Sequence, residues 1–499
     1  MVAGLENTAP ISTQISLIAQ GFPDAPAITC AGRTVTWTEL DADTNRRARA
    51  FADRGVGVGD YVTIVLPNSI EFLQSAIACW KLGAVPQPLP PRMPDIEFEG
   101  ILDLRPRALI VGRDDPRGQI PSLAAGFEPG PQFSADPLPE AVSPAWKCMA
   151  SGGSTGRPKL IEVGGDSRYP GKLFGQALGA VEGDVSLFSV PMSHNTGMVG
   201  ATVALLMRGH LIVMPKFDPA EFLRLITEHR VTYLATAPTI LHRALQTYRA
   251  DPQAYDLSSL RRVWHVGASC PPSVKDGWIE IVGPEALWEM YGGTELQALA
   301  VLSGTEWLAH RGSVGRVAVG QMKVLDDDGN ECAPGQTGEI FMRPAPGSDP
   351  TYRYIGATAK THAGWDSLGD LGHFDEDGYL YLSDRRVDMF TVGGKNTYPA
   401  EIEGNLCAHP DVLSCLVVGV PHDDLGQVPY AMIQLAEGAD LDADGVQAFL
   451  RERLENHKVP RTVEFVDRPL RDDAGKARRS AVRDEIGRAS CRERVSNCV

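Results

Sequence analysis

The sequence predicts an α/β fold with a large N-terminal domain and a smaller α+β C-terminal domain. Through the first 300 residues, apolar runs typical of buried strands alternate with segments of helical period, which favours a parallel sheet with covered faces. Beyond residue 300, short alternating segments separated by Asp-Gly and Pro-Gly turns predict a small antiparallel β unit. Near the C-terminus, helices and strands alternate again over about 100 residues, enough for a separate domain.

The individual segments follow from their periodicity and their turn residues. WTELDADTNRRARAF (37–51) has Leu40, Ala48 and Phe51 at helical spacing, and SIEFLQSAIACWKLG (69–83) is a second helical segment that ends at Gly83. Apolar runs predict further strands, and one more helix is expected; these segments are YVTIVLP, RALIVG, HLIVMP, VTYLATAP and RRVWHVG for the strands and PAEFLRLITEHR for the helix. In the C-terminal part, the helix and strand of AEIEGNLCAHPDVLSCLVVGVP precede a second pair, AMIQLAEG and VQAFLRERLENH.

Composition excludes several classes of protein. The 499 residues carry 47 Lys and Arg against 63 Asp and Glu, a net charge of -16, which excludes a general nucleic-acid binder. The most apolar long stretch, 197–214, is interrupted by Arg208 and His210, so we expect no transmembrane helix. The N-terminus shows no secretory signal pattern, which predicts a cytosolic protein. Nine cysteines without a CxxC pair are expected to be mostly buried free thiols.

The last residues do not resemble the rest of the chain. Back-translation of IGRASCRERV (486–495) resembles a short-read sequencing adapter, so we interpret 486–499 as a non-native tail. This leaves 1–385 for the N-terminal domain and 389–485 for the C-terminal domain.

The segment ASGGSTGRPKL (150–160) carries the clearest functional signal. Its glycines allow backbone N–H groups to converge on an anion, hydroxyl groups add donors, and a lysine adds positive charge, so the segment suits a polyphosphate. The predicted phosphate-binding residues are Ser151, Gly153, Ser154, Thr155, Gly156 and Lys159. A plain surface loop is the alternative, and the spacing does not match a Walker A loop.

This loop resembles the signature loop of the adenylate-forming superfamily, to which acyl-CoA and aryl-CoA synthetases and peptide-synthetase adenylation domains belong. The resemblance runs from about Ala25 to Arg483. It includes, in family order, WTELDADTNRRARAF, PNSIEFLQSAIACWKLGAV, MYGGTELQ, the segment 364–403 and VPRTVEFVDRPLRDDAGKARR. Gly152 and Leu160 depart from the usual loop residues, but both keep the loop small at its tip.

The resemblance implies roles for residues that would otherwise pass as ordinary loop and surface positions. It assigns Tyr291 to the adenine, Thr294 to phosphate, Glu295 to Mg²⁺, and Asp370 with Arg385 to the ribose. Gly267, Ala268 and Gly292 complete the implied nucleotide site. Lys476 matches a lysine that bridges the carboxylate and the α-phosphate, and with Thr155, Lys159 and His194 it forms the implied catalytic set.

His194 is a core histidine on its pattern alone, but its position resembles the histidine that borders the carboxylate site and the thiol tunnel of CoA synthetases. Amino-acid adenylation domains usually have Asp there, so its absence weighs against an amino-acid substrate. The implied acyl pocket contains His194, Met198, Val266 and Gly293. Glycine at both 292 and 293 predicts room for aromatic, alicyclic or longer acyl acids, unless these glycines serve only the backbone of the turn.

GGKNTYPAEIE (393–403) resembles the loop that moves into the active site for thioester formation. A pantetheine arm could approach Gly393, Gly394 and Lys395 closely, and the implied hinge is 386–388, although Val387 replaces the usual Lys or Asp. The alternative is a plain hairpin turn.

Together these residues predict an ATP- and Mg²⁺-dependent carboxylate–CoA ligase that forms an acyl-adenylate and transfers the acyl group to CoA. It would act on a small-molecule carboxylic acid as a monomer or homodimer. Two alternatives stay open, namely a stand-alone adenylation enzyme that loads a carrier protein and a non-catalytic nucleotide-binding relative.

Overall fold

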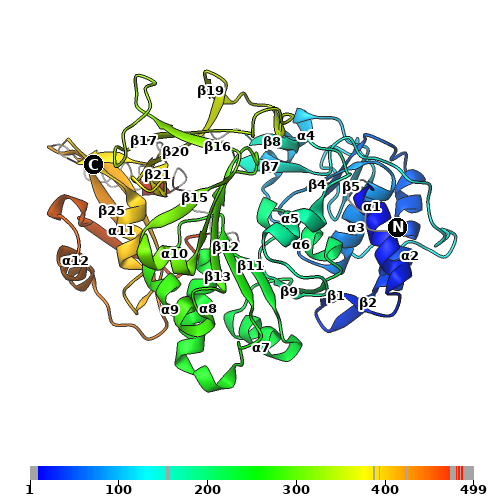
Figure 1. Cartoon of the computed structure of the whole chain (residues 1–499), viewed down its shortest axis with the longest axis horizontal. Helices are drawn as coiled ribbons and strands as arrows, with labels where there is room; N and C mark the ends of the chain where they lie inside the picture. Colours follow the sequence, from blue (N-terminus) through cyan, green and yellow to red (C-terminus); the bar gives the residue numbers. More distant parts are fainter. Residues whose placement is uncertain are drawn as a thin grey trace, which may run out of the picture.

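A long mixed sheet forms the centre of the computed structural model, which describes residues 9–152, 158–385, 388–392, 394–422, 424–471, 479, 482–483 and 485–486 (Figure 1). In spatial order its strands are β16 (Gln321–Leu325), β17 (Gly338–Arg343), β20 (Trp365–Phe374), β21 (Leu380–Arg385), β15 (Ser313–Val319), β14 (Leu299–Ser303), β13 (Leu287–Gly292), β12 (Arg262–Val266), β11 (Tyr233–Thr236), β9 (Val185–Phe188), β10 (His210–Val213), β1 (Pro26–Cys30) and β2 (Arg33–Thr36). A further strand, β19 (Lys360–His362), pairs with β20.

Three smaller sheets surround it. One is the parallel sheet β4 (Val85–Pro88), β3 (Tyr61–Ile64), β5 (Leu109–Val111) and β6 (Ser122–Leu123). The second is antiparallel and comprises β18 (Tyr352–Ile355), β8 (Pro158–Val163) and β7 (Cys148–Gly152). The third comprises β23 (Lys395–Thr397), β22 (Phe390–Val392), β25 (Gly426–Leu435), β24 (Val412–His422) and β26 (Thr462–Phe465).

Capping residues and glycines mark several of the helix ends. They are α1 (Ile11–Gly21), α2 (Trp37–Ala52), α3 (Ile70–Lys81), α4 (Asp95–Leu104), α5 (Gly171–Ala177), α6 (Asn195–Leu206), α7 (Pro219–His229), α8 (Pro238–Ala250), α9 (Pro272–Val282), α10 (Gly304–Ala309), α11 (Pro399–Leu406) and α12 (Ala443–Arg451), with 3-10 turns η1 (Pro252–Ala254) and η2 (Asn456–Lys458). Thr36 and Glu39 form a capping box at the start of α2. Gly83, two residues after α3, has φ +69, so the backbone there favours glycine.

Apolar residues cover both faces of the parallel part of the main sheet. On one face, Phe222, Leu241 and Trp278 from α7, α8 and α9 pack in one cluster with Leu234 and Val263 of the strands. Val203 and Met207 of the α6 segment belong to a cluster with Tyr233 and Trp264, whose strands are neighbours. The predicted α/β class is therefore confirmed, with covered faces as expected for parallel strands.

The order of the parallel strands reverses at β9. From β9 the chain crosses through α6 to β10 on one side, and then through α7 to β11 on the other side. The carboxyl ends of β9, β12 and β13 therefore lie at one edge of the sheet, next to the point where the strand order reverses. In open α/β sheets, ligands bind at this edge.

Beyond residue 300 the strands are antiparallel, as the turn pattern predicts. They are not a detached unit, however, because β14 pairs with β13 and extends the parallel sheet without a break. The chain then leaves this sheet after Arg385 in β21 and enters the five-stranded C-terminal sheet at Phe390 in β22. Residues 386–387 lie outside the described part, and the domain bounds expected from the sequence stay a prediction.

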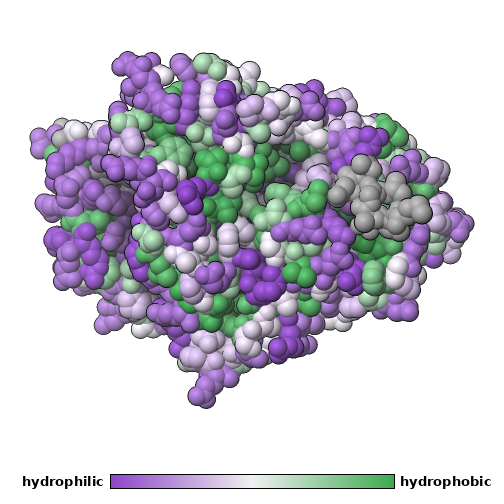
Figure 2. Space-filling model, viewed as in Figure 1, coloured by the Kyte–Doolittle hydropathy of each residue, from purple (hydrophilic) through white to green (hydrophobic). Residues whose placement is uncertain are grey.

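The C-terminal domain has its own core. Ile402 and Leu406 of α11 pack with Val417 of β24, Ile433 of β25 and Leu450 of α12. His242 Nε2 of α8 lies 3.2 Å from the Val412 carbonyl oxygen, which joins the two domains. Figure 2 shows hydrophilic residues over most of the rim of the viewed face and hydrophobic ones gathered nearer its middle.

The described residues bear on the expectations of no transmembrane helix and of free cysteine thiols. No helix among them is long and apolar enough to cross a membrane. Seven cysteines in this part are free thiols, namely Cys30, Cys79, Cys148, Cys270, Cys332, Cys407 and Cys415, as expected. Residues 487–499 lie outside the described part, whereas Ile486 packs against the cluster that contains Val482 and Leu470.

His210 makes folding stability sensitive to mild acid. Its ring lies 2.8 Å from the Thr29 hydroxyl, and burial, with a smaller effect of His229, lowers its pKa to about 4. The unfolded value is about 6.5, so its contribution to stability is complete above that pH and is lost as the pH falls toward 4. We predict that the melting temperature of His210→Gln falls less steeply than that of the wild type between pH 6.5 and 4.5. Parallel curves for the two proteins would contradict this assignment.

Candidate active site

The phosphate-loop segment is the connection of a β hairpin. Ser151 of β7 pairs with Lys159 of β8, and β8 pairs on its other edge with β18. Residues 153–157 lie outside the described part, so the positions predicted for Gly153, Ser154, Thr155 and Gly156 stay predictions. The described strands nevertheless hold the two ends of the loop in register.

Lys159 and Glu295 meet beside this hairpin. Lys159 Nζ lies 3.8 Å from Glu295 Oε1, and the Glu295 side chain is only 7% exposed. The Tyr354 hydroxyl of β18 donates to the same oxygen over 2.5 Å, and Lys159 Nζ lies 3.8 Å from the centre of the Tyr354 ring. Burial and the Glu295 carboxylate raise the pKa of Tyr354, which keeps its hydroxyl protonated as a donor. The predicted phosphate and metal residues therefore lie side by side.

The turn after β13 directs Glu295 to this position. Thr351 Oγ1 donates to the Glu295 carbonyl oxygen over 2.7 Å, and Leu296 N donates to the Gly293 carbonyl oxygen over 3.1 Å. Leu296 has φ +53, a left-handed conformation that costs a non-glycine residue roughly 1 kcal/mol. Such strain is often found at functional turns, and here it immediately follows the buried carboxylate.

Tyr291 brings the predicted nucleoside residues together. Its hydroxyl donates to Asp370 Oδ2 over 2.8 Å, which joins the end of β13 to β20. Asp370 pairs in turn with Arg385 across the β20–β21 ladder. Thr294 lies in the same turn, between Tyr291 and Glu295. Tyr291, assigned to the adenine, and Thr294, assigned to phosphate, therefore belong to one continuous segment, and Asp370 and Arg385 come to it from β20 and β21.

His194 lies in the segment that follows the carboxyl end of β9. It precedes α6 as the N-cap residue, and Asn68 fixes the segment before it, donating to the Val190 carbonyl oxygen over 2.9 Å and accepting from Met192 N over 2.8 Å. Gly267, at the end of β12, has φ +86, and a Cβ there would lie 3.8 Å from Thr196 Oγ1. Gly267 thus approaches the start of α6.

The predicted acyl-pocket residues have unequal surroundings. Met198 is 1% exposed and packs in the N-terminal core with Phe188 and Met192. At Gly293, a Cβ would lie 2.5 Å from both Glu295 Oε2 and Leu368 Cδ1. Neither Gly292 nor Gly293 has positive φ, so the need for small residues is explained by close packing rather than by backbone angles.

The predicted CoA loop is separate from these residues. Gly394 has φ +81 with no neighbouring atom within 4 Å of an added Cβ, and the exposed Lys395 pairs with Glu455 over 3.1 Å within the C-terminal domain. Gly393 and Lys476 lie outside the described residues. Among the described residues, Gly394 and Lys395 of the predicted CoA loop therefore contact no residue of the nucleotide segment.

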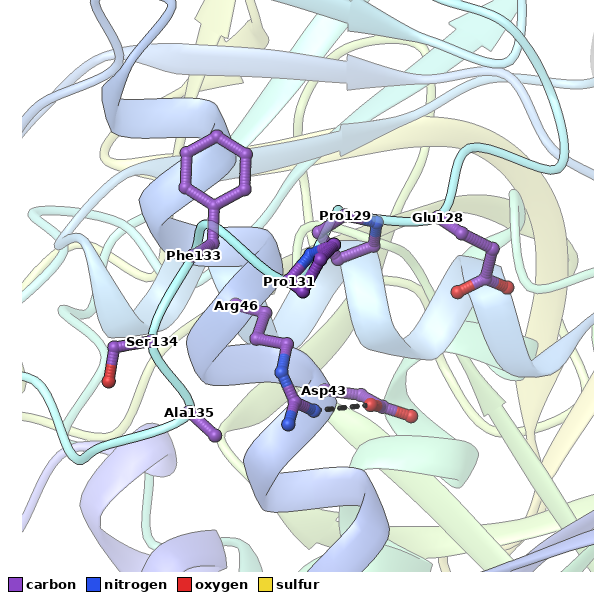
Figure 3. Close-up of a pocket in the computed structure, with 8 residues that line it drawn as sticks. All are labelled: Asp43, Arg46, Glu128, Pro129, Pro131, Phe133, Ser134 and Ala135. Carbon is purple, nitrogen blue, oxygen red and sulfur yellow. Dashed lines mark hydrogen bonds and ion pairs between the residues drawn. The ribbon is translucent and has the colours of Figure 1, made fainter.

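A surface pocket of about 400 Å³ lies elsewhere (Figure 3). Residues of α2 and of the segment 128–135 line it, including Phe133, and Arg46 pairs with Asp43 over 3.2 Å. None of the predicted site residues contributes to it.

Sequence reasoning missed Tyr354, Asn68 and Lys147. Tyr354 lies in the short alternating segment TYRYI, which carries no functional signature, and it reaches the site only through the pairing of β18 with β8. Lys147 gives a stronger signal, because it is a charged residue within an otherwise apolar run, WKCMA.

Comparisons with known proteins identify the family of this chain. Residues 16–347 match the family of AMP-binding enzymes, and residues 401–476 match the AMP-binding enzyme C-terminal domain. The chain belongs to the AMP-binding enzyme family, which is the adenylate-forming superfamily that its motifs resemble.

Individual relatives span nearly the whole chain. A feruloyl-CoA synthase from Amycolatopsis sp is 31% identical over 94% of this chain and 97% of its own length. A fatty acid–[acyl-carrier-protein] ligase from Streptomyces coeruleorubidus is 28% identical over 96% of each chain. The crystal structure of ATP-bound MatB from Rhodopseudomonas palustris has a TM-score of 0.76 and 26% identity, covering 94% of this chain and 98% of its own.

Glu295→Gln tests the metal assignment. Glutamine has nearly the same size and still accepts a hydrogen bond from Tyr354, but it removes the negative charge. We predict that the Mg²⁺ concentration for half-maximal acid-dependent pyrophosphate release rises about tenfold or more. Tyr354→Phe, which keeps the carboxylate, should have a smaller effect. An unchanged Mg²⁺ requirement in Glu295→Gln would exclude this residue as a metal ligand.

Proposed function

We propose that this protein is an ATP-dependent carboxylate–CoA ligase. The observation that carries the proposal is the turn after β13, in which Tyr291 contacts Asp370 and Glu295 lies beside Lys159. One segment thereby places a nucleoside position next to a phosphate position. Membership in the AMP-binding enzyme family supports the same chemistry.

The proposed reaction has two steps. A carboxylate oxygen of the acid attacks the α-phosphorus of ATP, the bond from that phosphorus to the bridging oxygen of pyrophosphate breaks, and an acyl-adenylate forms. The CoA sulfur then attacks the carbonyl carbon and AMP leaves. Lys159 and Lys476 supply positive charge to the phosphates, and Tyr291 with Asp370 orients the nucleoside, so the protein mainly positions reactants and stabilises charge.

The residues beside the phosphate loop suit a Mg²⁺ ion bound to the phosphates of ATP. Glu295 offers a buried carboxylate, a hard oxygen ligand, beside the hairpin that carries the phosphate loop. Magnesium sites commonly combine one or two carboxylates with substrate phosphates. When bound, Mg²⁺ would neutralise phosphate charge; Glu295 would hold it, and Tyr354 would orient the carboxylate.

The acid is proposed to be bulky, aromatic or alicyclic rather than short. The feruloyl-CoA synthase among the relatives acts on an aromatic acid and supports this class. Gly293→Met is not a clean test of pocket size, because the packing at this position means that the new side chain would also displace the Glu295 carboxylate. A substrate series answers the question without altering the site. A cytosolic location and a monomeric or dimeric state stay predictions.

Pyrophosphate release should be measured with a series of acids from acetate to aromatic and alicyclic acids, with and without CoA. We expect acid-dependent release, a thioester product only with CoA, and higher rates with bulky acids than with acetate. Product formation with a carrier protein but not with CoA would instead favour the carrier-loading alternative, to which one relative's name points. Nucleotide binding without acid-dependent turnover would indicate the non-catalytic alternative.

Lys476→Ala separates the two half-reactions. Because the lysine is proposed to act only in adenylation, acid-dependent pyrophosphate release should fall roughly 100-fold or more. Thioester formation from a supplied acyl-adenylate should stay near the wild-type rate. Lys458→Ala, which removes a C-terminal-domain lysine that pairs with Glu401, serves as the control. Equal losses in both half-reactions would contradict the assigned role.

Gly394→Leu should have the opposite effect. A bulky side chain at this exposed turn would obstruct a pantetheine arm, and the positive φ adds backbone strain. We predict slower thioester formation from acyl-adenylate with nearly normal adenylation. Gly394→Asn, whose side chain is smaller and tolerates the left-handed region, should be affected less. Normal thioester formation by Gly394→Leu would remove this loop from the proposed CoA path.

A further inference from the structure

Lys147 is a buried cation at the edge of the candidate site. It lies immediately before β7, is 1% exposed, and is flanked by the buried residues Trp146 and Cys148. Its ammonium donates to Asn195 Oδ1, and the Trp146 ring centre lies 5.0 Å away. The strand that leads into the phosphate loop is thereby joined to the first residue of α6.

The surroundings of Lys147 differ from those of the other buried lysines in the described part. Lys81 Nζ has Asp41 Oδ1 at 2.7 Å, and Lys275 pairs with the Glu289 carboxylate. For Lys147, no carboxylate oxygen of the described residues lies within 4.0 Å of Nζ. Burial lowers its pKa to about 7, and only more distant acidic groups, Cys148 and Glu295, act in the opposite direction. A cation buried without a paired charge opposes folding, which suggests a role other than stability.

The position of Asn195 connects this cation to the site. Asn195 follows His194 directly, and Asn68 already fixes Val190 and Met192 on the other side of His194. The hydrogen bond from Lys147 is therefore a second attachment of the same segment. Lys147 precedes Ser151 by four residues, and Ser151 belongs to the β7–β8 hairpin that carries the phosphate loop. This attachment therefore fixes His194 relative to that hairpin.

We propose that Lys147 is a positioning residue for acid activation, which holds His194 at the carboxylate site through Asn195. This inference rests on the proposed function. Lys147 does not touch the reacting atoms; it acts through the start of α6. A structural core lysine is the competing interpretation, and the two differ in what replacement by an apolar side chain does.

Lys147→Met keeps the length of the side chain and removes its charge and its hydrogen bond. We expect kcat/KM for the acid in pyrophosphate release to fall about 10- to 100-fold, as small displacements of a site can cause. AMP binding should change less than threefold. The melting temperature should be unchanged or higher, because an unpaired buried cation is removed. A structural lysine would instead lose activity and melting temperature together.

Lys81→Met is the matched control, because it leaves the Asp41 carboxylate without its cation. It should lower the melting temperature and leave the kinetics of the folded enzyme close to the wild type. Asn195→Ala should resemble Lys147→Met, and the double variant should be no worse than either single variant, because both remove the same attachment. Additive losses would contradict action through Asn195.

A substrate-independent measurement separates this inference from the proposed function. Amide hydrogen exchange in peptides covering 189–200 should be several-fold faster in Lys147→Met than in the wild type and unchanged in Lys81→Met. Unchanged exchange in Lys147→Met would overturn the inference even in an active enzyme. A wild type inactive with every acid, but with the expected exchange pattern, would contradict the proposed function and leave the attachment supported.

Discussion

The candidate site depends on the interactions of the buried Glu295 carboxylate. It accepts a hydrogen bond from Tyr354 and faces Lys159, so it joins the turn after β13 to the sheet that carries the phosphate loop. The same turn begins at Tyr291, which reaches across to Asp370 on β20. Three separate parts of the chain are thus held around one anionic group, and positive charge from a metal and from Lys159 would compensate it when nucleotide binds.

This arrangement is possible because the carboxyl ends of parallel strands share an edge. β9, β12 and β13 deliver His194, Gly267 and Tyr291 to that edge, and the antiparallel continuation from β14 brings Asp370 back to it. The hydrogen bond from Lys147 to Asn195 adds a connection between the start of β7 and the start of α6. The site is therefore built from interactions distant in sequence, and its geometry depends on the packing of the whole N-terminal domain.

Periodicity and turn chemistry predicted the alternating helices and strands and the antiparallel region, because those signals are local. They did not indicate that β14 would extend the parallel sheet, since strand pairing is decided by tertiary packing. Motif resemblance predicted Tyr291, Glu295 and Asp370 as site residues. Tyr354 and Lys147 lie outside the motifs and come near the candidate site only in the folded chain. The glycines at 292–293 show that a sequence does not reveal which atoms fill the space beside a glycine. Their missing side chains suggested open space, whereas Glu295 and Leu368 occupy the space beside Gly293.

The central claim is that a carboxylate oxygen attacks the α-phosphorus of ATP at this site. An acid labelled with ¹⁸O in both carboxylate oxygens should be incubated with ATP, Mg²⁺ and CoA, and the nucleotide product analysed by mass spectrometry. Attack by the carboxylate predicts one ¹⁸O atom in AMP and none in pyrophosphate, because the oxygen that bonds to phosphorus leaves with AMP. Unlabelled AMP, or label in a released phosphate, would contradict the account.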